Sequence, residues 1–472
     1  TALRETQEET GLVLDAVPLL DLGRLDYRPR KDLHLFAALQ PRDLSDRALE
    51  EQARSLTGIG QVRLQEGNHA EAMAAFAEAH ARSDALHRRA PDDGTRLFDL
   101  AQAEYWIGYV AWQQGRLDQA GTWLRRYRDS AIRLAALDPR NFDWQREVAY
   151  GHHNLAVLDD SLGRYAEAER AMRDELALYR EWTRARPDDT ALRFEAANVA
   201  SWLGGLMLRQ GRLGEAEAFF AEEMRALALN ARAEPKDPKW RNEQAEALLL
   251  LAETLAMQGQ AGTARTHADA ACALAAGLAR HDPANNDWRA GLGICRLAQA
   301  QLAAPAAPAS TLDPAQSAIA LLSAAHAAEP KNERKRLWLA RAHLFAAQRA
   351  LAEGEPQRAG PHAALAVGTL EPAWRVEQND RLRLWLGWAR LVQGDVAHAR
   401  GDGAAAGIAW REASALLRDG QQPPPFAHLE PLVRALVALG HDAEAKAHRE
   451  RLDQARYVPA RPWPPRTAVP RA

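Results

Sequence analysis

Cysteine is nearly absent from this chain of 472 residues, which contains only Cys272 and Cys295. Both lie in helical stretches beside alanine and leucine, a setting typical of small buried hydrophobic residues and not of a disulfide or metal pair. Lys and Arg number 60 against 63 Asp and Glu, so the net charge is only −3. That balance lacks the basic field of a nucleic-acid-binding protein, and we expect no nucleic-acid partner.

Long apolar runs and targeting signals are also missing. No stretch has the length needed to cross a bilayer, and no signal peptide is visible, so we expect a cytoplasmic protein that does not bind membranes. The chain has no nucleophile elbow, phosphate loop or dinucleotide fingerprint, which argues against an enzyme of those classes. His152 and His153 have no Asp, Glu or Cys at ligand spacing on their own helix, and we assign them a structural or surface role.

Glycine and proline, by contrast, recur with a fixed period of 48 residues. The glycines are Gly67, Gly115, Gly163, Gly211 and Gly259, and the prolines, half a period later, are Pro91, Pro139, Pro187, Pro235 and Pro283. Such a period indicates a stacked array of repeats. Roughly 20 residues lie between successive markers, enough for one helix of five turns. Glycine suits the left-handed turn within a helix pair, and proline suits the joint between pairs.

Side-chain size follows the same period. Small residues stand seven before each turn glycine (Gly60, Gly108, Ala156, Gly204, Ala252) and five after it (Ala72, Ala120, Ala168, Ala216, Ala264), and bulky residues stand nine after it (Phe76, Leu124, Met172, Phe220). We expect the paired helices to approach closely at the small residues. Trp144, Trp240 and Trp288, each five residues after a proline, are expected to seal the joints between repeats and not to contact a ligand.

This combination of small residue, turn glycine, aromatic or leucine, and alanine resembles the tetratricopeptide repeat, whose usual period is 34 residues. It is similar to a longer variant found in many bacterial multi-repeat proteins, in which the joint often has a sequence like that of residues 138–146. The resemblance is strong from residue 45 to about residue 300. It implies an all-α fold, a right-handed superhelical solenoid of about eight helix hairpins.

We expect the chain to be organised in five segments. Residues 1–44 do not follow the repeat, 45–303 form the regular array, and 304–312 form a Pro/Ala loop. Residues 313–457 contain degenerate repeats in which Gly354, Gly401 and Gly440 stand at the turns, and 458–472 are a Pro-rich tail that cannot continue a helix.

The first segment contains a motif associated with catalysis. Residues 4–12, Arg-Glu-Thr-Gln-Glu-Glu-Thr-Gly-Leu, resemble the second half of the Nudix box. Glu5, Glu8 and Glu9 share one helix face at this spacing, and hard carboxylate oxygens suit Mg²⁺ bridging a diphosphate. The resemblance implies that these three glutamates bind the metal and that Arg4 orients one of them.

The Nudix-like segment also departs from its family. Thr6 replaces an aliphatic residue, and the first half of the box is missing. Val13–Leu14 and Leu33–Leu39 are expected strands, for which the segment offers no pairing partners. We interpret the segment as an incomplete fragment with no catalytic residues of its own. An intact Mg²⁺-dependent diphosphate hydrolase, whose first half precedes this sequence, is the alternative.

Stacked helix pairs form a concave surface that suits a peptide or a partner helix. If the geometry of the family applies, the first helices of the pairs place seven residues on that surface: Tyr105, Tyr109, Trp112, Tyr150, His153, Asn198 and Arg209. Aromatic residues and arginine concentrate binding energy at interfaces, although the same aromatic residues could instead be buried between longer helices. We predict a non-enzymatic scaffold that binds a protein or peptide without a cofactor. A sensor or docking region of a larger bacterial signalling protein is a further alternative.

Overall fold

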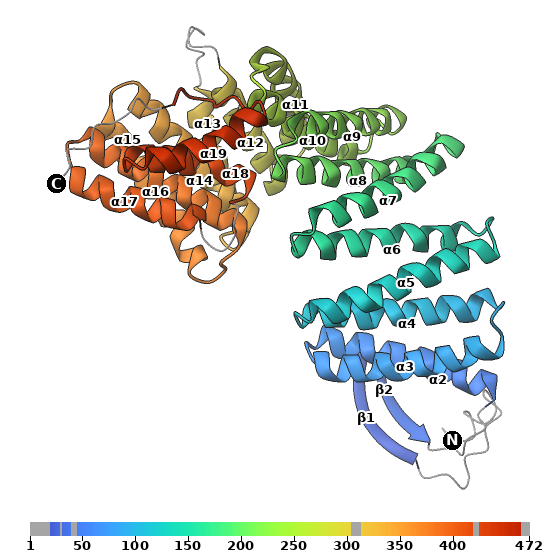
Figure 1. Ribbon diagram of the computed structural model, residues 1–472. Helices are drawn as coiled ribbons and strands as arrows, with labels where there is room; N and C mark the ends of the chain where they lie inside the picture. The colour runs from blue at the N-terminus through green and yellow to red at the C-terminus, as the bar shows by residue number, and fades with distance from the viewer. Residues whose placement is uncertain (1–18, 29–30, 39–44, 304–312, 419–423, 464–472) are drawn as a thin grey trace. The chain divides into compact units, whose positions relative to one another are not determined.

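The computed structural model describes residues 19–28, 31–38, 45–303, 313–418 and 424–463. By its contacts the chain divides into two units, Thr1–Leu178 and Tyr179–Ala472, and the boundary falls within the helix Tyr165–Ala185, labelled α7 in Figure 1. Within each unit, consecutive helices pack against one another in pairs. The chain is therefore an array of helical hairpins, as the repeat pattern predicts.

Unit 1 begins with a two-stranded sheet and continues with three helix pairs. The pairs are α2 (Asp46–Gln65) with α3 (His69–Arg89), α4 (Gly94–Gln113) with α5 (Leu117–Leu137), and α6 (Phe142–Ser161) with α7 (Tyr165–Ala185), whose last residues belong to unit 2.

Unit 2 contains the remaining six pairs, which makes nine among the described residues where the sequence indicated about eight. They are α8 (Thr190–Arg209) with α9 (Leu213–Ala233), α10 (Pro238–Met257) with α11 (Ala261–His281), α12 (Asn286–Leu302) with α13 (Pro314–Ala328), α14 (Glu333–Ala352) with α15 (Pro356–Trp374), α16 (Asp380–Ala399) with α17 (Gly403–Arg418), and α18 (Phe426–Ala438) with α19 (Asp442–Gln454).

The two strands form an antiparallel hairpin. β1 (Leu19–Arg28) pairs with β2 (Lys31–Ala38), with Leu25 opposite Leu33 and Leu19 opposite Ala38. The strand predicted at Leu33–Leu39 is thus present as far as Ala38. The expectation that it lacks a pairing partner is wrong, because the preceding residues fold back and satisfy its backbone groups locally. The other predicted strand, Val13–Leu14, lies outside the described residues.

All eight of the predicted turn glycines have left-handed backbone conformations. In the five regular repeats φ lies between +71° and +77°, and Gly354, Gly401 and Gly440 have φ of +76°, +84° and +77°. At the first turn the Gly67 amide donates to the Leu64 carbonyl, and the Asn68 amide donates to the Arg63 carbonyl at 2.8 Å. This is the Schellman arrangement, which requires a positive φ and so favours glycine.

The joints between pairs depend on an Asp or Asn that the sequence analysis overlooked. Two residues after each proline stands the N-cap of the next helix: Asp93, Asn141, Asp189, Asp237, Asn285 and, after Pro330, Asn332. Each side chain accepts a hydrogen bond from a backbone amide of the first turn, as Asp189 does from Leu192 at 3.0 Å. Proline ends one helix and the Asx residue starts the next.

The predicted close approach within pairs is confirmed. A Cβ placed on Gly60 would lie 2.6 Å from the ring of Phe76, and one on Gly204 would lie 2.6 Å from the ring of Phe220. Both rings are almost fully buried, at 0% and 1% exposure. The period of small and bulky residues therefore records real contacts between the two helices of a hairpin.

The joint tryptophans divide into two kinds. The ring of Trp144 packs against Gly94, and Trp240 is 4% exposed and donates its indole N–H to Glu234 at 2.7 Å. Trp288, in contrast, is half-buried and lines a cavity. Cys272 and Cys295 are buried free thiols, as expected, and a hydrogen bond with Cys272, followed by burial, raises the pKa of Cys295.

The last hairpin packs back onto earlier repeats of unit 2. α18 is buried over most of its surface, and its Leu429, Leu432 and Leu436 are 0% exposed, which places this helix largely in the interior. The Phe426 ring lies against the α8–α9 turn, 2.6 Å from the position of a Cβ on Gly211, and the Val458 amide donates to the Met257 carbonyl at 2.7 Å. Residues 458–463, the described part of the Pro-rich tail, are not helical.

Candidate functional site

The predicted binding residues of α4 form a continuous strip of aromatic rings, which we call the α4 aromatic face: Tyr105, Tyr109 and Trp112. The ring centroids of Tyr105 and Tyr109 are 6.0 Å apart, and those of Tyr109 and Trp112 are 6.5 Å apart. All three side chains are half-buried. Spacings of four and three residues place them on one side of the helix, so the structure does bring them together.

The α4 aromatic face is also part of the packing of unit 1. Tyr105 and Trp112 lie against the buried cluster that contains Leu124 and Leu158, and the Tyr105 ring is 5.5 Å from that of Tyr127 on α5. Tyr105 and Trp112 therefore contribute to the packing of the hairpin. The role of the face in binding a partner stays a prediction.

A partly buried polar network lies beside the face and joins three helices. The Tyr127 hydroxyl of α5 donates to Glu147 Oε2 of α6 at 2.7 Å, and Gln102 Nε2 of α4 donates to the same oxygen at 2.8 Å. Burial raises the pKa of the Glu147 carboxyl and that of the Tyr127 hydroxyl. Glu104 of α4 is 6% exposed, and burial raises its pKa to about 7, against a hydrogen bond from Ser130 of α5.

The two candidates on α6 are more accessible. Tyr150 is 43% exposed, and the His153 side chain is 46% exposed. His153 Nδ1 lies 3.2 Å from Glu175 Oε2 of α7, and His152 Nδ1 lies 3.9 Å from Asp174 of the same helix. The carboxylate partners that these histidines lack on their own helix therefore come from the next one, where sequence spacing could not reveal them.

The remaining two candidates, Asn198 and Arg209, belong to unit 2. Both are exposed on α8, and the Arg209 guanidinium lies over the Trp202 ring at 5.7 Å. The predicted set thus separates into five residues in unit 1 and two in unit 2.

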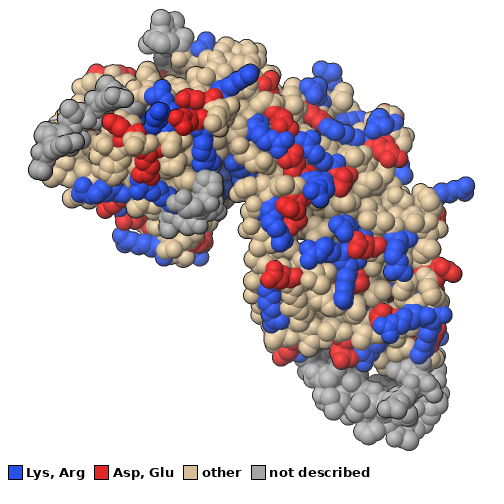
Figure 2. All heavy atoms as spheres, viewed as in Figure 1, with Lys and Arg blue, Asp and Glu red and all other residues tan. Residues whose placement is uncertain are grey.

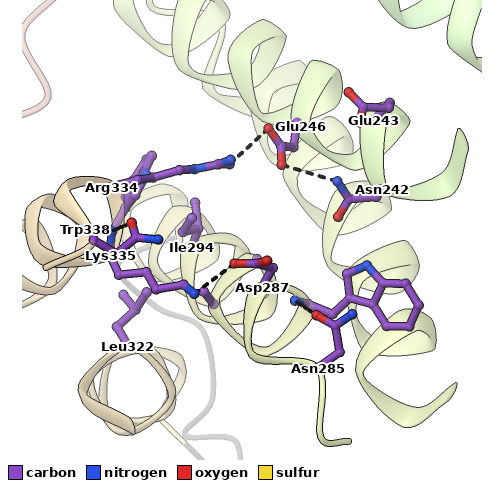
Figure 3. Close-up of a pocket in the computed structure, with 14 residues that line it drawn as sticks. Asn242, Glu243, Glu246, Asn285, Asp287, Ile294, Leu322, Arg334, Lys335 and Trp338 are labelled. Carbon is purple, nitrogen blue, oxygen red and sulfur yellow. Dashed lines mark hydrogen bonds and ion pairs between the residues drawn. The ribbon is translucent and has the colours of Figure 1, made fainter. Parts of the chain in front are cut away.

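Unit 2 also contains a cavity of about 380 Å³ that the sequence analysis missed, which we call the α10–α14 cavity. Figure 3 shows its wall of charged and polar side chains from α10, α12 and α14 and from the caps that precede α12 and α14. Arg334 pairs with Glu246 at 2.9 Å, and Lys335 pairs with Asp287 at 2.8 Å. The available signals were Glu243-x-x-Glu246 on α10 and Arg334–Lys335 on α14, the first helices of hairpins two repeats apart, but nothing in their spacing joins them.

Charge on the visible surface is mixed. Figure 2 shows Lys and Arg side chains interspersed with Asp and Glu, in keeping with the net charge of −3. Within the described residues, no helix is sufficiently long and apolar to span a membrane, and no three His, Cys, Asp or Glu side chains are placed to hold a metal ion. Glu5, Glu8 and Glu9 lie outside the described residues, so the Mg²⁺ site implied by the Nudix resemblance stays a prediction.

No family model matches the sequence, and no curated protein matches it. Among solved structures, the chain is similar to the apo form of RapI (9% identity, TM-score 0.49, covering 80% of this chain and 88% of that chain). It is also similar to a tetratricopeptide repeat protein from Parabacteroides merdae (14% identity, TM-score 0.38, covering 72% of this chain and 99% of that chain). A third similar structure is the human IFIT1 dimer with PPP-AAAA (16% identity, TM-score 0.31, covering 87% of this chain and 94% of that chain). Since these TM-scores are below 0.5, the fold assignment rests on the observed helical hairpins. The comparisons do not test whether this chain binds nucleic acid, so the absence of a nucleic-acid partner stays a prediction.

Proposed function

We propose that this protein is a non-enzymatic scaffold that binds a protein or peptide partner through the first helices of its hairpins, with the α4 aromatic face as the principal contact in unit 1. The observation that carries the proposal is the partial exposure of three adjacent aromatic rings on one rigid helix. Half-buried rings lose the rest of their contact with water when a partner covers them, and each such ring contributes strongly at interfaces.

The surroundings of the face favour the same function. The network of Tyr127, Glu147 and Gln102 fixes α4, α5 and α6 relative to one another, so little ordering entropy is lost on binding. The exposed side chains of Tyr150 and His153 on α6 extend the surface with a ring and a polar group. A partner peptide in extended or helical form fits such a surface.

Selection from a library of random peptides displayed on phage, with the full chain as bait, tests the proposal. Selected peptides should bind the Tyr105→Ala, Trp112→Ala double variant at least tenfold more weakly, the loss expected for two interface aromatics. Tyr150→Ala, which removes a more exposed ring, should weaken binding without affecting the hairpin. Tyr165→Ala, a half-buried tyrosine on the second helix of a pair, is the matched control and should bind normally.

Helicity measured by circular dichroism must be unchanged in every variant for the comparison to hold. Equal affinity of the double variant and the parent chain would remove the α4 aromatic face from consideration. A pool of single-stranded RNA offered in parallel tests the class of partner, and retention of RNA without peptide binding would contradict it. The hydrolase alternative is tested by Mg²⁺-dependent turnover of nucleoside diphosphate derivatives, with Glu8→Gln and Glu9→Gln as controls.

A further inference from the structure

The α10–α14 cavity carries an excess of carboxylates. Three acidic side chains line it, Glu243, Glu246 and Asp287, against the two cations Arg334 and Lys335. Both cations already have partners. The Lys335 side chain is only 3% exposed and pairs with Asp287 and also with Glu329 outside the cavity, and Arg334 pairs with Glu246. An anionic ligand would therefore have to displace existing carboxylates.

Glu243 is the one of these three carboxylates that pairs with neither Arg334 nor Lys335. It makes no ion pair with any residue that the structure describes, and the Asn242 side-chain amide donates to Glu246 Oε1 at 3.4 Å. Burial, and then the neighbouring Glu246, raise the pKa of Glu243, and the nearby cations Lys239 and Arg334 offset only part of that rise. Glu243 and Glu246 stand three residues apart on one face of α10, and Figure 3 shows both at the same side of the cavity.

The same two helices, α10 and α14, already hold one guanidinium between a carboxylate and aromatic rings. Arg341 of α14 lies 3.7 Å over the ring of Trp338 and 4.4 Å over that of Trp385, and its guanidinium pairs with Glu253 of α10 at 2.6 Å. A carboxylate with aromatic faces is a favourable site for an arginine side chain. The cavity combines Glu243 and Glu246 with the indole of Trp288, and it shares Trp338 with the Arg341 stack.

We propose that the α10–α14 cavity binds an arginine side chain of a partner peptide, with Glu243 as the principal carboxylate and Trp288 and Trp338 as the aromatic walls. The Arg334 side chain is 58% exposed, so it can move to share Glu246 with the incoming guanidinium. The site lies wholly in unit 2 and is independent of the α4 aromatic face in unit 1. Either can therefore fail without the other.

Gly291 provides a variant that fills the cavity without disturbing the fold. It lies on α12, lines the cavity, and a Cβ placed on it would meet no atom within 4 Å. Gly291→Leu therefore introduces a side chain into the empty space and also replaces a helical glycine with a better helix former. Gly277→Leu on α11 is the matched control, because a Cβ there also meets nothing within 4 Å and Gly277 does not line the cavity.

The probe is a short fluorescent Gly/Ser peptide with one central arginine, titrated into the full chain by anisotropy. Peptides with citrulline, lysine or glutamate at that position are compared with it, citrulline being the neutral isostere of arginine. We expect the arginine peptide to bind with a Kd below about 1 mM and the citrulline peptide to bind at least about tenfold more weakly. Glu243→Gln and Gly291→Leu should each reduce arginine binding at least tenfold, and Gly277→Leu should not.

Three results would overturn the proposal. One is the absence of arginine-peptide binding at millimolar concentration, and another is equal affinity for the citrulline or glutamate peptide. The third is full binding by Gly291→Leu. The thermal midpoints of Gly291→Leu and Gly277→Leu should match or exceed that of the parent chain, which separates a blocked cavity from a damaged fold.

Discussion

Arg341 of α14 and Glu253 of α10 pair at 2.6 Å although 88 residues separate them in the chain. Arg334 and Glu246 repeat the pairing at the same separation, two helical turns away on both helices. The first helix of one hairpin is thus tied to the first helix of the hairpin two further along. These ion pairs hold together the two sides of the surface on which a partner is expected to bind.

A double-mutant cycle on Glu253→Ala and Arg341→Ala should give a coupling free energy of about 1 kcal/mol that decreases as salt is added. The two side chains are only 32% and 17% exposed, so water screens the pair incompletely. The measurement is urea denaturation of the four proteins at low and high ionic strength. The exposed pair Lys446 and Glu450, 79% and 59% exposed, is the control and should show no measurable coupling. A coupling near zero for Glu253 and Arg341 would contradict the prediction.

Alanine substitutions at two glycines of α2 should have opposite effects on stability. Gly60→Ala places a methyl group 2.6 Å from the Phe76 ring and should destabilise unit 1 by about 1–3 kcal/mol, because the close-packed ring has to move. Gly58→Ala, two residues away on the same helix, meets nothing within 4 Å and should stabilise by about 0.5–1 kcal/mol. Urea midpoints of the two variants check the prediction. Shifts in the same direction would show that the Gly60–Phe76 contact is not close-packed.

Replacement of the N-cap Asp189 should cost about 1 kcal/mol of stability, because Asp189→Ala leaves the Leu192 amide without its acceptor. The neighbouring Asp188 is exposed and makes no such bond, so Asp188→Ala should change stability by less than about 0.5 kcal/mol. Thermal and urea unfolding of the two variants provide the comparison. Equal effects would mean that charge near the helix terminus, and not the capping bond, supports α8.

The stability of unit 1 should depend on pH through Glu104. Burial raises the pKa of this carboxyl in the folded protein to about 7. The contribution of the protonated carboxyl to the free energy of unfolding is therefore fully present below about pH 4.5 and is lost as the pH rises through 7. Glu104→Gln removes that dependence. The variant should therefore gain up to about 3 kcal/mol relative to the parent chain between pH 4 and pH 8, as measured by urea unfolding at each pH. A constant difference across this range would show that Glu104 does not titrate as its burial predicts.

Local backbone rules explain why so much of the fold was predictable. A left-handed turn needs glycine, and a tight helix contact needs a small residue, so Gly67 or Gly60 can be assigned from spacing alone. The proximity of Tyr105, Tyr109 and Trp112 likewise follows from helical geometry within one element. The Asx caps after each proline carried an equally local signal, and they could have been recognised from the same period.

Contacts between distant repeats were decided by the tertiary structure. The packing of Phe426 against Gly211, the pairing of Glu253 with Arg341 and the enclosure of the α10–α14 cavity each join elements that lie far apart in the chain. Such contacts depend on how small rotations between successive hairpins add up along the array, and no residue encodes that sum by itself. The β1–β2 pairing also required the folded chain, because strand partners are chosen by register and not by the composition of one strand.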